Sequence, residues 1–234
     1  MTSTRLPGKV LAELAGKPML AQQLLRLRAC KSLDEIVLAT SDRIEDDRLV
    51  TVADQAGVRC VRGSEHDVLG RYVLAARESK AELVVRITAD CPLIDAEVTD
   101  AVVHLATDAE SPCDYASNTL VRSYPRGLDV EAFHRDVLDR MARHARSAAA
   151  REHVTYFLHR ERPELFVTKN LVAAADASDL RWTVDTAEDL ELVRRIYSTA
   201  GLPERDVRYS DLVALVRASP DLMTLNAHVV QKTH

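Results

Sequence analysis

Hydrophobic and polar positions along the chain fall into two alternating patterns, one typical of buried strands and one of amphipathic helices. Residues 35–40 form an apolar run without polar alternation, as a parallel strand in a covered sheet requires. Residues 58–61 and 83–88 are predicted to be further strands. One helix is expected to begin at Pro18. Three further helices are expected at 46–56, 67–80 and 95–107. Strands alternating with helices of this length indicate βαβ units and a mostly parallel sheet with helices on both faces.

The second half of the chain is less regular, and it combines loops with helices. Two prolines and scattered polar residues in 111–130 favour loops with short strands, and 165–171 is predicted to be a strand. Thr186 is a suitable N-cap for a helix that Gly201 ends. The full set of helices expected here is 135–145, 148–160, 187–200, 210–218 and 221–230. We find no internal repeat or linker, so residues 1–234 are predicted to form a single domain.

Composition narrows the class of protein. The chain has 234 residues, of which 47% are hydrophobic, so it can bury a full core and is not expected to be disordered. Its net charge of −5 argues against general nucleic-acid binding. It has neither an apolar run of the ~18–20 residues that span a membrane nor the apolar core of a signal peptide. The four cysteines have no metal-like spacing, which favours a reduced, cytoplasmic protein.

The first nine residues contain a candidate phosphate-binding loop. Hydroxyl side chains lead into Pro7-Gly8, and Arg5 and Lys9 lie four residues apart. Backbone N–H groups in such a turn can surround a phosphate, and the two cations can neutralise it. The segment is not a Walker loop, because Val10 stands where Ser or Thr should follow the lysine. The alternative interpretation is an ordinary basic N-terminal arm.

Two aspartates follow predicted strands. Asp90 comes after the strand at 83–88, and Asp185 comes after Trp182-Thr183-Val184 and just before a helix. In open α/β sheets, ligands bind beyond the carboxyl ends of the strands. Two carboxylates that converge there can hold Mg²⁺, which prefers oxygen ligands and keeps positions open for substrate phosphates. The alternative is that each aspartate caps the N-terminus of the following helix.

Further polar clusters lie at the ends of predicted elements. Ser41-Asp42 ends a strand, where it can contact a ligand or simply form a turn. Gly70-Arg71 follows a glycine-containing turn, and Arg151-Glu152-His153 opens a helix that could equally present a solvated face. The segment 126–131 combines a glycine with the charged residues Arg126, Asp129 and Glu131.

Six runs together resemble one family across nearly the whole chain. They are 2–11 (TSTRLPGKVL), 15–18 (AGKP), 67–72 (DVLGRY), 86–95 (RITADCPLID), 125–131 (PRGLDVE) and 180–186 (LRWTVDT). In this order they are similar to the spore coat polysaccharide biosynthesis protein F family. That family belongs to the cytidylyltransferases and is related to CMP-KDO and CMP-N-acylneuraminate synthetases.

The resemblance implies an α/β fold of the nucleotide-diphospho-sugar transferase type, a Rossmann-like three-layer α/β/α sandwich with a mostly parallel mixed sheet. It also implies CTP as the nucleotide and Mg²⁺ as the cofactor, held by Asp90 and Asp185. Carried over by motif, nucleotide contacts are expected from Ser3, Thr4, Arg5, Lys9, Ser41, Asp42, Gly70 and Arg71. Contacts to the acceptor sugar are expected from Arg126, Asp129, Glu131, Arg151, Glu152 and His153.

The sequence also departs from the family pattern at its start. Family members begin with a buried strand that ends in Gln-Ala-Arg, whereas this sequence starts inside the phosphate loop. We therefore expect the sheet to lack its first strand and to have unpaired edges, and we expect Met1 to be an internal methionine of a longer reading frame. Ala89 also replaces a glycine that is usual before the metal-binding aspartate.

The reaction implied is transfer of CMP from CTP to an acidic sugar with release of pyrophosphate. Arg5, Lys9, Asp90 and Asp185 are the expected catalytic residues, in a cytoplasmic homodimer that binds neither nucleic acid nor membrane. Phosphoryl transfer of this kind requires the protein mainly to position the substrates and to neutralise their charge. Two alternatives are a glycosyltransferase on the same fold and a non-catalytic homologue that acts as a binding partner.

Overall fold

The central feature of the structure is a sheet in two pieces, seen in a computed structural model that describes residues 5–231. One piece is the parallel pair of β3 (Val37–Ser41) and β4 (Arg59–Gly63). The other has the strand order β5-β7-β6-β8. Its strands are β5 (Leu83–Arg86), β6 (Tyr115–Ser117), β7 (Glu131–His134) and β8 (Thr168–Asn170). β7 is antiparallel to both of its neighbours, and β6 and β8 are parallel, so the sheet is mixed.

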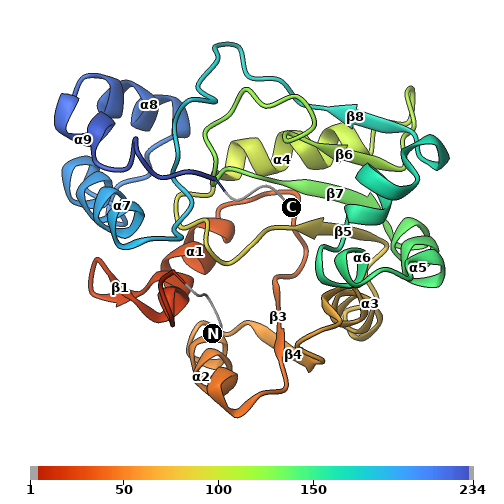
Figure 1. The fold of residues 1–234 in the computed structure, drawn as a ribbon. Coiled ribbons are helices and arrows are strands. Elements are labelled where there is room, and N and C mark those ends of the chain that lie inside the picture. Colours follow the sequence, from red (N-terminus) through yellow and green to blue (C-terminus); the bar gives the residue numbers. More distant parts are fainter. Residues whose placement is uncertain (1–4, 232–234) are drawn as a thin grey trace.

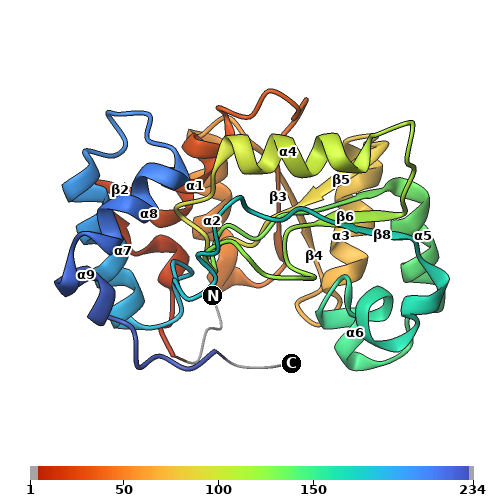
Figure 2. The same ribbon diagram turned by 90° about the horizontal axis from the view of Figure 1, so that it is seen from above.

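Helices cover both faces of the four-stranded sheet (Figures 1 and 2). On one face lies α4 (Ala96–Ala106). On the other lie α3 (Val68–Glu78), α5 (Arg135–His144) and α6 (Ala148–Glu152). The arrangement is the three-layer α/β/α sandwich that the sequence predicts.

The alternation of side chains along the strands explains the two layers. Successive residues of a strand point to opposite faces. Tyr115 and Phe133 therefore pack with α3 and α5 in one apolar cluster. Their chain neighbours Ala116 and Ala132 lie in a second cluster with α4, where small side chains let the helix approach closely.

The remaining helices flank the sheet at its other end. α1 (Met19–Leu27) and α2 (Asp47–Gln55) pack against β3. A short antiparallel pair, β1 (Glu13–Leu14) and β2 (Lys17–Pro18), precedes α1. On the left of Figure 1, a separate group is formed by α7 (Ala187–Ala200), α8 (Tyr209–Arg217) and α9 (Pro220–Thr224). These helices share an apolar cluster with Trp182, which is buried. Short turns complete the set: η1 (Lys9–Leu11), η2 (Ile44–Asp46), η3 (Phe157–Glu161, a π-helix) and η4 (Pro163–Leu165).

The structure corrects three details of the predicted elements. The helix expected at 148–160 ends at Glu152, because Thr155 turns inward and donates a hydrogen bond to Glu131. The helix expected at 221–230 ends at Thr224, because Asn226 donates to the carbonyl of Arg181 instead of continuing the helix. β7 lies in a segment for which no strand was expected, and its antiparallel pairing makes the sheet less parallel than predicted.

The two pieces of the sheet are separated between β3 and β5. In Figure 1, β4, β3, β5, β7, β6 and β8 follow one another across the molecule. Within residues 5–231, β3 pairs only with β4, and β5 pairs only with β7. Among these residues, each of the two strands therefore has one edge without a strand partner.

A strand added upstream of Met1 should therefore stabilise the fold. We expect a chain extended by a short Val/Ile-rich segment ending in Gln-Ala-Arg to melt at a higher temperature, because that segment can pair with both free edges. Thermal unfolding followed by circular dichroism measures the shift. The control is an extension of equal length made of Gly and Ser, and equal melting temperatures for the two extended chains would contradict the prediction.

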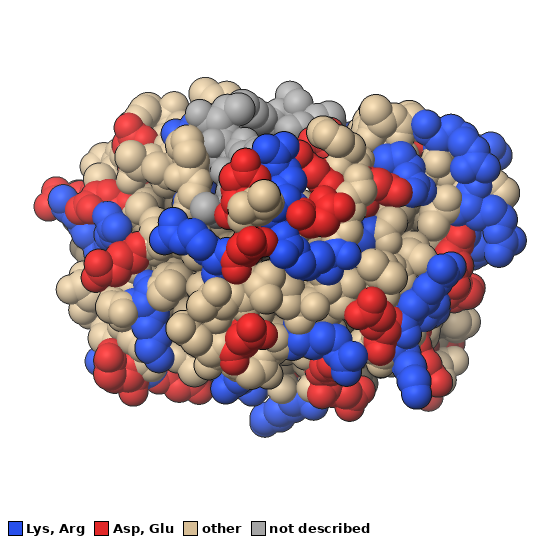
Figure 3. Space-filling model, turned by 90° about the horizontal axis from the view of Figure 1, so that it is seen from below, with Lys and Arg blue, Asp and Glu red and all other residues tan. Residues whose placement is uncertain are grey.

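Charges of both signs are interleaved on the surface. Figure 3 shows basic and acidic side chains alternating across the middle of the face seen from below.

All four cysteines, Cys30, Cys60, Cys91 and Cys113, are free thiols. None of the helices within residues 5–231 is long and apolar enough to cross a bilayer.

Candidate active site

A turn at the N-terminus directs a lysine into the centre of the candidate site. Gly8 has a φ of 69°, in the left-handed region, and its carbonyl accepts a hydrogen bond of 2.9 Å from the N–H of Leu11. The short helix η1 begins directly after this glycine, with Lys9 as its first residue. The Lys9 side chain is only 13% exposed, so the turn buries most of its length and directs its ammonium group inward.

That ammonium group bridges Asp90, which follows β5, and Asp185, which directly precedes the N-cap of α7; the strand expected at 182–184 is not formed, and only Arg181 makes an isolated bridge there. Lys9 Nζ donates to Asp90 Oδ2 at 2.9 Å and to Asp185 Oδ1 at 2.7 Å. Arg5 forms an ion pair of 2.9 Å with the second oxygen of Asp185. The four residues predicted to be catalytic, Arg5, Lys9, Asp90 and Asp185, are thus brought together from segments far apart in the chain.

Asp90 is held by the turn that follows β5. Thr88 Oγ1 donates to Asp90 Oδ1 at 2.6 Å, which leaves Oδ2 for Lys9. The carbonyl of Asp90 accepts from the N–H of Val184 at 2.9 Å and so ties the two aspartate segments together. The next helix, α4, is capped by Asp95, whose carboxylate accepts from the N–H of Val98. Asp90 is therefore not a helix cap.

Asp185 is held from behind by a buried arginine. Arg181 Nη2 donates to Asp185 Oδ2 at 2.7 Å, and Arg181 also bonds Asp189, whose side chain is fully buried. Thr186 and Asp189 form the capping box of α7, with Thr186 as the N-cap. The cap interpretation of Asp185 is therefore wrong: its neighbours supply the cap, and its carboxylate points to Lys9 and the two arginines.

Burial and charge act in opposite directions on these groups. Burial alone would lower the pKa of Lys9, but the charges of Asp90 and Asp185 and their hydrogen bonds outweigh it and raise that pKa above its ordinary value. Burial would raise the pKa of Asp185, but the hydrogen bond and charge of Lys9, followed by Arg181, hold it below its ordinary value. Both groups therefore stay charged around neutral pH.

Cys91 is adjacent to this cluster but is not a nucleophile. Burial, followed by the charge of Asp90, raises the pKa of the Cys91 thiol well above its ordinary value. A thiol acts as a nucleophile in its thiolate form, which this environment disfavours.

A cavity of about 200 Å³ opens beside the aspartates. Its lining residues are Arg5, Thr88, Asp90, Cys91, Arg126, Gly127, Asp129, Thr183, Asp185 and Gln231. Of the residues expected to contact the acceptor, Arg126 and Asp129 thus lie at the site. Asp129 is held by a bidentate pair with Arg122 at 2.7 and 2.8 Å.

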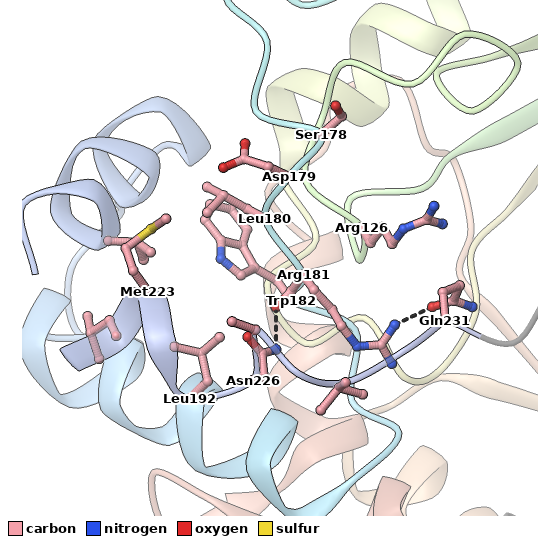
Figure 4. A pocket seen from close by; sticks show the side chains of 14 residues that line it. Arg126, Ser178, Asp179, Leu180, Arg181, Trp182, Leu192, Met223, Asn226 and Gln231 are labelled. Atoms are coloured by element: carbon pink, nitrogen blue, oxygen red, sulfur yellow. Dashed lines mark hydrogen bonds between the residues drawn. The ribbon is translucent and has the colours of Figure 1, made fainter. Parts of the chain in front are cut away.

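A second cavity of about 310 Å³ adjoins the first and shares Arg126 and Gln231 with it. Figure 4 shows Met223 and Leu192 at its apolar end and Arg126, Arg181 and Gln231 at the other.

Gly127 joins the loop that carries Arg126 and Asp129 to the segment that carries Asp185. It has a φ of +103°, and a Cβ at this position would lie 2.6 Å from the backbone nitrogen of Thr183. The neighbouring residues Arg126 and Arg181 form an isolated parallel bridge. Only glycine permits so close an approach of the two backbones.

The other predicted nucleotide contacts lie outside the lining of this cavity. Ser41 ends β3, and its hydroxyl donates to Asp46 at 2.6 Å, whereas Asp42 is exposed. Gly70 lies in the first turn of α3, where its N–H bonds the capping residue Asp67. Arg71 follows it in α3, and Ser3 and Thr4 lie outside the described residues. Their roles in nucleotide binding stay predictions.

The other predicted acceptor contacts are also separate from the aspartates. Arg151 forms an ion pair with Asp67, and Glu152 and His153 lie at the end of α6. Glu131 is buried, and its oxygens accept from Arg86, Tyr115 and Thr155. Because these partners come from the interior, the geometry favours a positioning role for Glu131, and contact with the acceptor stays a prediction.

Sequence reasoning missed the residues that support the site. Arg181 and Asp189 lie four residues before and after Asp185, which is a visible spacing, but no role in holding Asp185 was considered for either of them. Thr88 lies two residues before Asp90 in the run that carries the family resemblance. No signal in the sequence indicated that Arg86 would meet Glu131, because 45 residues separate them.

Comparisons with known proteins identify the family. A family model described as cytidylyltransferase matches residues 1–207. This chain is a cytidylyltransferase. It is 35% identical over 232 residues to the spore coat polysaccharide biosynthesis protein SpsF of Bacillus subtilis (strain 168), covering 96% of this chain and 93% of that protein. The resemblance noted in the sequence is therefore confirmed, and the cytidylyltransferase is an enzyme of the nucleotidyltransferase class.

Solved structures agree with this assignment. A cytidylyltransferase from Leptospira borgpetersenii superposes with a TM-score of 0.91 at 30% identity, covering all of this chain and 95% of that one. CMP:2-keto-3-deoxy-manno-octonic acid synthetase, in complex with CTP, superposes with a TM-score of 0.65 at 18% identity, covering 85% and 95% of the two chains. The second likeness shows that the cytidylyltransferase shares that fold.

Proposed function

We propose that this cytidylyltransferase transfers CMP from CTP to a hydroxyl group of an acidic sugar, for the synthesis of a surface polysaccharide or glycoconjugate. The observation that carries the proposal is the convergence of Asp90 and Asp185 on one cation, with Arg5 beside them. The names of the relatives support the biological setting, because one is a spore coat polysaccharide protein and another is a CMP-sugar acid synthetase. A cytoplasmic location and a homodimer belong to the same proposal.

The two carboxylates fit a divalent cation. They already hold a positive group between them, the Lys9 ammonium, at hydrogen-bond distance from both. Residues 5–231 contain no cluster of three or more His, Cys, Asp or Glu side chains suited to a metal, so phosphate oxygens and water must complete the coordination. This matches Mg²⁺, which usually takes one or two carboxylates together with substrate phosphates. When bound, Mg²⁺ would neutralise charge on the α-phosphate and help activate the attacking oxygen.

The protein's own residues position the substrates and stabilise the leaving group. The acceptor oxygen forms a bond to the α-phosphorus, and the bond from that phosphorus to the bridging oxygen breaks, so that pyrophosphate leaves. The proton of the acceptor hydroxyl passes to solvent water. Arg5 and Lys9 would bind the β- and γ-phosphates and stabilise the charge that builds on pyrophosphate. Arg181 holds Asp185 in orientation from behind. No covalent enzyme intermediate is needed.

Arg126 supports an acidic acceptor. Within residues 5–231 its guanidinium forms no hydrogen bond or ion pair, although it lies where the two cavities meet. Burial, followed by the nearby charge of Arg122, lowers the pKa of Arg126. A cation in such surroundings is stabilised by an incoming anion. We infer that Arg126 pairs with the carboxylate of the sugar.

The test is pyrophosphate release from each nucleoside triphosphate in the presence of acidic or neutral sugars. We expect CTP and an acidic sugar to be required together. Arg126→Gln should raise the KM for the sugar about 10- to 100-fold, the equivalent of one charged hydrogen bond, and leave CTP binding little changed. Arg59→Gln, which removes an exposed arginine paired with Glu35, is the matched control. A new glycosidic bond without pyrophosphate would instead identify a glycosyltransferase, and failure to bind CTP would identify a non-catalytic homologue.

A further inference from the structure

We propose that Lys9 is an internal counter-ion that a divalent cation must displace before it can bind Asp90 and Asp185. The inference rests on the proposed function, in which these two carboxylates hold the metal. It adds a competition between a residue of the protein and its cofactor. Lys9 then has two alternative sets of partners, the carboxylates in the free enzyme and the phosphates in the substrate complex.

The first argument is the position of the ammonium group. Mg²⁺ binds oxygen ligands at about 2.0–2.1 Å. A cation held by Asp90 and Asp185 would need oxygens of both carboxylates, and Lys9 Nζ already contacts one oxygen of each, at 2.9 and 2.7 Å. At those two oxygens the ammonium group and the cation would overlap, so they cannot bind there together.

The second argument is that the remaining carboxylate oxygens are also engaged. Asp90 Oδ1 accepts from Thr88, and Asp185 Oδ2 accepts from Arg181 and pairs with Arg5. A cation that approached from another side would meet these donors, two of which are positively charged. Release of Lys9 is the exchange that frees one oxygen on each aspartate.

The third argument is that Lys9 has fewer restraints than Arg181 and can exchange its partners more easily. Lysine has a flexible four-carbon stem, and η1 is a single short turn of three residues. Arg181 is 8% exposed and is fixed by two hydrogen bonds to Asp189. When the ammonium leaves, Arg181 therefore still holds Asp185 in place.

The consequence is a coupling between cation and nucleotide. Without nucleotide, the free energy of metal binding is reduced by the full cost of separating Lys9 from two carboxylates. With a triphosphate present, the released ammonium gains new anionic partners, and the exchange becomes favourable. We infer that the free enzyme binds divalent cations weakly because Lys9 occupies their position.

The test is calorimetric titration of Mn²⁺ into the nucleotide-free chain. Lys9→Met removes the competing charge, so it should bind Mn²⁺ about 10- to 100-fold more tightly than the wild type, as expected for the loss of a charged hydrogen bond. Lys9→Arg keeps the charge and should bind Mn²⁺ as weakly as the wild type. Lys17→Met, which removes an exposed lysine of the same N-terminal segment, is the control and should change nothing. Equal affinities for Lys9→Met and the wild type would overturn the inference.

A measurement on the wild type covers the case in which Lys9→Met does not fold. Amine-reactive labelling mapped by mass spectrometry should modify Lys9 slowly without metal and faster at saturating Mn²⁺, with no change at Lys17. A Lys9 labelling rate that Mn²⁺ does not alter would count against displacement. Asp185→Asn separates the two proposals: if it binds Mn²⁺ as the wild type does, the metal site itself is wrong, whereas if it loses binding and Lys9→Met is neutral, only the role of Lys9 fails.

Discussion

Asp185→Asn should lower the rate of pyrophosphate release from CTP by at least about 100-fold. A bound metal ion stabilises the transition state by several kcal/mol, and each ~1.4 kcal/mol corresponds to a tenfold change in rate. Asparagine keeps the size of the side chain but removes the charge that pairs with Lys9, Arg5 and Arg181. The same loss is expected for Asp90→Asn. Initial rates at saturating CTP measure the effect.

The fold of these variants should survive, because the capping of α7 depends on Thr186 and Asp189 and not on Asp185. Asp211→Asn, which alters an exposed ion pair with Arg208, is the matched control and should keep normal turnover. Near-normal turnover in either site variant, with an unchanged circular dichroism spectrum, would show that its carboxylate does not bind the metal.

Glu131→Ala should lower the free energy of unfolding by about 3–5 kcal/mol, the range found when one partner of a buried ion pair is removed. Glu131 is buried and accepts from Tyr115 at 2.8 Å and Thr155 at 2.6 Å, in addition to its pair with Arg86. Removal of the carboxylate leaves the largely buried Arg86 guanidinium and the Thr155 hydroxyl without their acceptor. Urea denaturation measures the loss, and the control Glu191→Ala, which breaks an exposed pair with Arg195, should cost less than about 1 kcal/mol.

The contribution of Glu131 to the free energy of unfolding should depend on pH in a defined direction. Burial would raise the pKa of Glu131, but the charge of Arg86 and the hydrogen bonds outweigh it and hold the pKa well below its ordinary value. A carboxyl with a depressed folded-state pKa contributes stability above its ordinary pKa of ~4.3 and loses it as pH falls toward the folded value. The stability gap between the wild type and Glu131→Gln should therefore be full at pH 6 and narrower at pH 3. A gap that stays constant would contradict the assigned pKa direction.

The helices and the parallel strands could be predicted because their signals are local. α7 runs from Ala187 to Ala200 as expected, since Thr186 caps its start and Gly201 ends it. The convergence of Asp90 and Asp185 was also predicted, but the reason given for it holds only for Asp90, which follows β5. Residues 182–184 form no strand, and Asp185 is placed by the hydrogen bond from the N–H of Val184 to the carbonyl of Asp90. β7 could not, because Glu131 is a charged residue whose burial depends on Arg86, a partner 45 residues away. The end of α6 at Glu152 could not be predicted for the same reason, because it depends on the hydrogen bond from Thr155 to the carboxylate of Glu131.

The close backbone contact at Gly127 couples the movement of the loop that carries Arg126 to that of the segment that carries Asp185. A Cβ there would meet the backbone of Trp182 and Thr183 at 2.6 Å, so the loop that carries Arg126 cannot shift without carrying the segment that leads to Asp185. Relative movement of Arg126 and Asp185 is thereby restricted, and in the proposed reaction this would fix the acceptor relative to the α-phosphate. Adjustment during turnover is left to the N-terminal turn, which contributes Arg5 and Lys9 on long side chains.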